Sequence, residues 1–225
     1  MRVLKLVFDW SEVWALMIPI FFILIKKNKS KYLRPIVVYV FMAFFINLFA
    51  DIIADFKIPF HFPIYFQTNT FLYNTHSIIR FVCFSSFFLL LNSPFSKTFT
   101  RVVQVVGFTF TIIYFCFENF NNPNHISGDF LAIEALLMLI ICMLYFLTKL
   151  KDDHFKPLES PDFYIALGLS IYVVINFFVF LFYIPMIEDN AEFANQMWSI
   201  HNAAYIILCI FIAKAFNTPT PSHAT

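Results

Sequence analysis

Charge and glycine are both scarce in this sequence. Only 13% of its 225 residues are charged, three are glycine, and 60% are apolar. A soluble domain carries about 25% charged and about 45–50% apolar residues. A chain of this size cannot bury so much apolar surface in a soluble core, so the composition indicates a membrane protein. It excludes a disordered chain, and a net charge of +1 gives no basic surface for nucleic acid.

The familiar signatures of catalysis and of metal binding are also missing. The four cysteines lie far apart, without a CxxC pair, which is typical of small apolar core residues. The chain has no Walker loop, no GxSxG and no HExxH. We therefore predict no catalytic residue and no cofactor, and the motifs decide nothing about a metal.

Long apolar stretches dominate what is present. A helix needs roughly 20 mostly apolar residues to cross a bilayer, and seven stretches qualify. They are residues 10–25, 35–55, 70–91, 101–117, 129–147, 162–183 and 193–216. The fold predicted for residues 1–225 is an all-α polytopic membrane protein, a single transmembrane domain that forms a seven-helix bundle.

The distribution of charge predicts the orientation of this bundle. Basic residues fill alternate loops, Lys26–Arg34, Lys97–Arg101 and Lys149–Lys156, and Lys214 ends the last stretch. The other side carries mostly acids, which are Asp9, Glu12, Asp55, Glu118, Asp129, Glu188, Asp189 and Glu192. Because lysine and arginine concentrate on the cytoplasmic side of membrane proteins, we expect the N-terminus outside and the C-terminus in the cytoplasm.

Polar residues inside apolar spans are costly and commonly mark function. Eight of them form the predicted ligand-binding set: Asp51, His76, Arg80, Glu134, Asn176, Trp198, His201 and Asn202. At 1.5 Å per residue, most of them lie in the outer half of the bundle, which predicts a polar pocket open to the outside and a dry inner half.

Arg80 has two candidate partners in that set, Asp51 and Glu134. Such an ion pair either fixes helix packing or belongs to a ligand or proton site. His76 and His201 are interpreted as hydrogen-bonded core histidines or, alternatively, as metal or haem ligands.

Four segments carry a resemblance to a known group of proteins. They are FFINLFAD at 44–51, NTFLYNTHSIIR at 69–80, PDFYIALGLSIYVVIN at 161–176 and WSIHNAAY at 198–205. They resemble small seven-helix inner-membrane proteins of Bacteroidetes-type bacteria, a group with no assigned activity. The resemblance implies a bacterial inner (plasma) membrane location and, because similar proteins tend to be encoded near sensor kinases, a link to signalling.

Three functions are consistent with these features. We expect an integral membrane sensor or signalling subunit that binds a small or lipidic ligand in the outer pocket. It would act through a partner protein at the basic cytoplasmic loops. A proton-coupled transporter and a metal- or haem-binding membrane enzyme are the alternatives. In each case the lipid bilayer is a partner and nucleic acid is not.

Overall fold

The chain is seen in a computed structural model that describes residues 7–26, 30–56, 70–91, 94–114, 128–153 and 155–219. Seven long α-helices make up most of this described part, which contains no strand. Their bounds are α2 Ser11–Lys26, α3 Arg34–Phe56, α4 Thr70–Leu90, α5 Pro94–Tyr114, α6 Gly128–Lys149, α7 Pro161–Asp189 and α8 Ala191–Asn217. Two short 3-10 helices, η1 (Lys31–Leu33) and η4 (Pro157–Glu159), precede α3 and α7.

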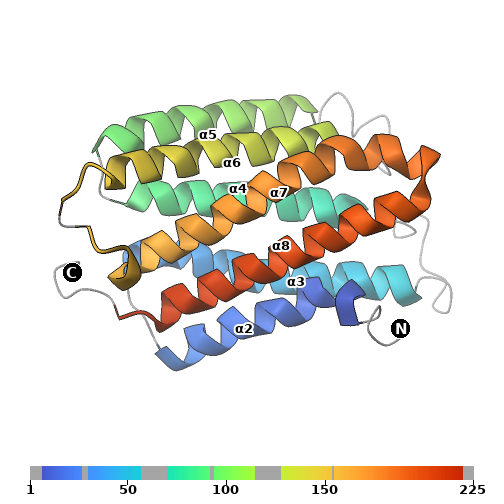
Figure 1. The fold of residues 1–225 in the computed structure, drawn as a ribbon, viewed down its shortest axis with the longest axis horizontal. Helices are drawn as coiled ribbons and strands as arrows, with labels where there is room; N and C mark the ends of the chain where they lie inside the picture. Colours follow the sequence, from blue (N-terminus) through green and yellow to red (C-terminus); the bar gives the residue numbers. More distant parts are fainter. Residues whose placement is uncertain are drawn as a thin grey trace.

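Successive helices run in opposite directions along one long axis (Figure 1). Consequently α2, α4, α6 and α8 begin at one end of the bundle, and α3, α5 and α7 begin at the other (Figure 1). Helix α8 packs against both α7 and α2, α2 packs against α3, and α3 packs against α4. Helix α6 packs against α4, α5 and α7, so the helices close into a ring with α5 on its outside.

A core of apolar and aromatic side chains fills the centre of this ring. Leu16, Ile36, Phe84, Met138 and Leu208 are all fully buried within it. The outward faces are also apolar, with many large side chains more than half exposed on α2, α3 and α5. Apolar residues on both the inside and the outside of a bundle are expected where lipid is the solvent.

Four helices are long and apolar enough to cross a membrane: Lys31–Ala54, Phe130–Lys149, Pro161–Tyr183 and Glu192–Asn217. They belong to α3 with its preceding turn, α6, α7 and α8. The protein is therefore an all-helical chain with membrane-capable helices, which places it in contact with a lipid bilayer. Helix α2 has only 16 residues, and the described parts of α4 and α5 are less apolar.

Helix boundaries agree with the seven predicted stretches within a few residues, except at two places. Helix α5 begins at Pro94 and not near residue 101, because proline suits the first helical turn and the polar residues that follow it lower the hydropathy. Helix α7 continues past residue 183 to Asp189. Backbone hydrogen bonds, and not apolar side chains, decide where a helix ends.

Candidate functional site

A buried acid–histidine pair joins the first and last helices of the described chain. The carboxyl group of Glu12, in the first turn of α2, is hydrogen-bonded to Nε2 of His201 on α8 at 2.8 Å. The other ring nitrogen of His201 bonds to the side-chain oxygen of Asn176 on α7, whose amide nitrogen donates to the carbonyl of Tyr172 at 2.8 Å. An imidazolium donates both of these bonds, whereas a neutral imidazole makes both only if the Glu12 carboxyl carries a proton.

A second pair lies next to the first and joins α4 to α6. Arg80 bonds to Glu134 through Nε, at 3.1 Å, and through Nη2. Ser77 donates to the same carboxylate at 2.7 Å. The guanidinium also donates to the hydroxyl of Tyr172 on α7 and lies 5.0 Å from the centre of that ring.

Tyr172 connects the two pairs. Its carbonyl accepts from Asn176 and its hydroxyl accepts from Arg80. One connected set of contacts therefore runs from Glu12 to Glu134 through α2, α8, α7, α4 and α6, and we call it the polar network. Its members, which are all buried, are Glu12, Ser77, Arg80, Glu134, Tyr172, Asn176 and His201.

The Arg80–Glu134 pair is shielded from water. The Arg80 and Glu134 side chains are 4% and 5% exposed. Removing both charges from water costs several kcal/mol per ion. Their mutual attraction and the bonds from Ser77 and to Tyr172 offset this cost only while every partner is in place. The network therefore ties its helices to one mutual arrangement.

A small cavity lies beside the polar network, with a volume of about 20 Å³. Its walls come from α4, α6, α7 and α8: Tyr73, His76, Ser77, Arg80, Leu131, Phe180, Trp198 and His201. The half-buried Trp198 ring lies 4.8 Å from the His201 ring, 5.5 Å from Tyr73 and 5.3 Å from Tyr183, measured between centroids. We call Trp198, Tyr73 and Tyr183 the aromatic cap.

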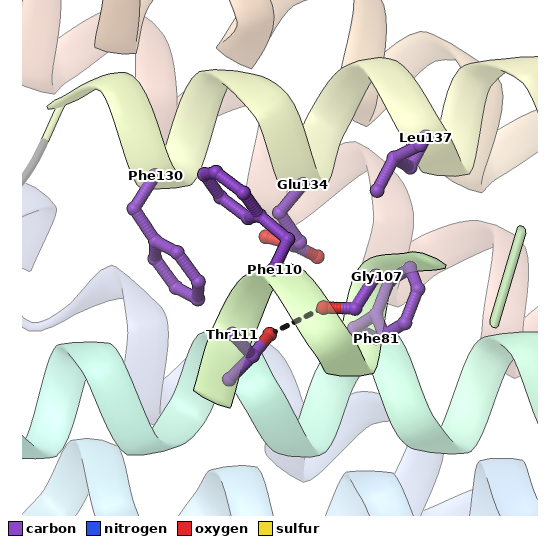
Figure 2. Close-up of a pocket in the computed structure, with 7 residues that line it drawn as sticks. All are labelled: Phe81, Gly107, Phe110, Thr111, Phe130, Glu134 and Leu137. Carbon is purple, nitrogen blue, oxygen red and sulfur yellow. Dashed lines mark hydrogen bonds between the residues drawn. The ribbon is translucent and has the colours of Figure 1, made fainter. Parts of the chain in front are cut away.

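The opposite side of Glu134 faces a second, smaller cavity of about 10 Å³ between α4, α5 and α6. Figure 2 shows Glu134 extending from α6 beside Phe110, Phe130 and Gly107, which line this cavity with it. The ring of Phe81 packs so closely on Gly107 that a side chain there would displace it. On this side Glu134 therefore faces a mostly apolar wall, whereas Arg80 and Ser77 bond to its carboxylate.

The structure brings six of the eight predicted residues together. His76, Arg80, Trp198 and His201 line the larger cavity, and hydrogen bonds link Glu134 and Asn176 to them. Of the two predicted partners of Arg80, the structure selects Glu134.

The other two predicted residues line neither described cavity. Asp51 is half-buried on α3. Asn202 is buried and donates to the carbonyl of Phe8 at 3.1 Å. Asp51 and Asn202 therefore stay predictions as site residues, and neighbours on a helix such as His201 and Asn202 point in different directions.

Three members of the polar network, Glu12, Ser77 and Tyr172, were not among the predicted site residues. Glu12 was counted as one of the outer acids, although it stands two residues inside the first apolar stretch, and that position is the signal that could have identified it. Tyr172 entered only through the resemblance. A tyrosine among aromatic residues gives no sign that its hydroxyl and carbonyl join two ion pairs.

Among the described residues, no group of three or more His, Cys, Asp or Glu side chains could hold a metal ion. Comparison of the chain with protein-family models, with curated proteins and with solved structures found no match. The site is therefore interpreted from its own geometry.

Proposed function

We propose that the chain is a multi-pass protein of a bacterial inner membrane, with seven spans, its N-terminus outside and its C-terminus in the cytoplasm. The alternating helix directions support this topology (Figure 1). So does the position of the described basic residues other than Arg80, which belong to the end of the bundle where α3, α5 and α7 begin. They are Lys26, Lys31, Arg34, Lys97, Arg101, Lys149, Lys151, Lys156 and Lys214. This topology also fits the small seven-helix proteins that the sequence resembles.

Within that topology, the protein acts as a sensor or signalling subunit. The polar network extends from the outer end to the middle of the bundle: Glu12 lies in the first turn of α2, and Arg80 and His201 are each ten residues, about 15 Å, from the outer start of their helices. A small or lipidic ligand enters at the aromatic cap, where Trp198 covers His201. Movement of Trp198 changes the contacts of His201, and through them the packing of five helices.

The signal leaves at the basic end, through a separate partner protein. Lys149 there bonds to Asp162 at 3.1 Å and lies 4.7 Å from the centre of the Phe155 ring, which fixes the connection between α6 and α7. Since both helices carry members of the polar network, a shift at the outer end is transmitted along them to this connection. The single observation that carries the proposal is the continuous polar network beneath an aromatic cap.

Native mass spectrometry of the protein, purified gently from its own membranes, tests this function. We expect a co-purifying small molecule or lipid that is lost in Trp198→Phe and in His201→Gln. The bound mass should persist in Trp14→Phe, which is the matched control. Trp14 lies at the same end of the bundle, but its indole donates to the carbonyl of Val7 at 2.8 Å and does not line the cavity. A chain that carries no bound mass, or brings only another protein, makes the network a packing element and contradicts the proposal.

A further inference from the structure

His76 is the one imidazole in this region that takes no part in the polar network. It lies on α4, is 5% exposed, and stacks on Tyr39 of α3 with 5.8 Å between the ring centres. Tyr205 of α8 meets it edge-on at 6.0 Å. Its Nε2 has no hydrogen-bond partner among the described residues. Leaving a buried polar atom unpaired costs about 1–3 kcal/mol. The unpaired Nε2 therefore calls for a hydrogen-bond partner, and a second observation indicates where that partner lies.

That observation is the cavity that His76 lines. A cavity needs about 10–15 Å³ of this kind of volume to hold one water molecule, with two to four polar partners. The cavity beside His76 offers about 20 Å³. It is therefore large enough for one water molecule, and an organic ligand can enter only if Trp198 moves aside.

The cavity walls also supply polar partners besides His76. Arg80 has five N–H groups, and its bonds to Glu134 and Tyr172 use three of them. Ser77 and Tyr73 line the same space, and a hydroxyl oxygen can accept further hydrogen bonds. A molecule that both donates and accepts fits this wall, whereas an apolar one does not.

We propose that this cavity is a built site for one water molecule, bonded to Nε2 of His76 and shared with the polar groups of the opposite wall. The water joins His76 to the polar network. Because Tyr39 of α3 stacks on His76, the water also connects α3 to the other helices. The inference goes beyond the proposed function, because it does not depend on any other ligand. It also adds a requirement to that function: a ligand that enters beneath the aromatic cap must displace this water and replace its hydrogen bonds.

A structure of the wild-type protein in lipid or detergent, at a resolution that shows other buried waters, is the deciding experiment. We expect density for one water within hydrogen-bond distance of His76 Nε2. A dry cavity, or a protein atom paired directly with Nε2, would overturn the proposal. Because this experiment uses no ligand, a water present alongside failed ligand binding would contradict only the sensor function.

Thermal unfolding of two variants gives an independent check. His76→Leu removes the proposed bond to water at similar volume, and we expect it to lower Tm by about 2–4 °C. Thr100→Val is the matched control, because the Thr100 hydroxyl is also fully buried without a partner but lines neither described cavity. Its Tm should stay constant or rise. A rise in Tm for His76→Leu as well would mean that both atoms are dry, contrary to the proposal.

Discussion

Removing one member of the Arg80–Glu134 pair should destabilise the protein far more than removing both. Arg80→Met leaves a buried carboxylate without its cation, and Glu134→Leu leaves a buried guanidinium without its anion. Breaking a buried pair in this way costs about 3–5 kcal/mol. For a domain of 150–250 residues each kcal/mol changes Tm by about 2–4 °C, so each single variant should lose roughly 6–20 °C.

The double variant removes both charges and fills the space with apolar side chains. The hydroxyls of Ser77 and Tyr172 then lose their partners, at about 1 kcal/mol each. The expected total of about 2 kcal/mol lies well below the roughly 6–10 kcal/mol that two independent losses would give.

Tryptophan fluorescence during heating of the purified protein measures these changes. The control is Glu159→Gln, which breaks an exposed pair with Lys156 and should alter the unfolding free energy by less than about 1 kcal/mol. Additive losses in the double variant, or single variants with the wild-type Tm, would refute the reasoning that the pair is buried and interdependent.

Three further changes test the packing around the network. Gly168→Ala should lower Tm by several degrees, because the new Cβ would lie 2.5 Å from Cβ of Phe211. Such overpacking costs about 1–3 kcal/mol. A Tm at or above wild type would contradict the close approach of α7 and α8. Gly107→Ala should lower Tm less than Gly168→Ala, since the neighbouring atoms belong to the tip of the Phe81 ring, which can move. The order of the two Tm values checks this. Tyr145→Phe removes a 2.9 Å bond to Asp162 and should cost about 1.5–3 kcal/mol in the unfolding free energy, a loss that chemical denaturation can detect.

Much of the fold could be predicted because hydropathy reports the bilayer. Apolar stretches fall on α2 to α8 within a few residues, as α3 and α6 show. The helix ends were harder to predict where polar residues occupy the first helical turns, as in α5. The number of spans and the orientation stay predictions, since four helices satisfy the criterion for crossing a membrane.

The candidate site could be predicted only in part, for a physical reason. Helical spacing places Arg80 on one face with His76, but which helix packs opposite depends on the closure of the ring. That closure selects Glu134 and not Asp51 as the partner of Arg80. It also brings Glu12 to His201, 189 positions along the chain. Contacts between helices so distant in sequence leave no local pattern to read.

Hydrogen exchange in lipid nanodiscs tests the central claim, that the polar network couples the outer end to the basic end. Glu12→Gln weakens the bond to His201 without touching the basic end, and Trp14→Phe is the control on the same helix. The account predicts faster exchange in the α7 and α8 turns around Asn176 and His201, and also in residues 150–160, at the opposite end. A change confined to α2 and the turns it touches would contradict the coupling.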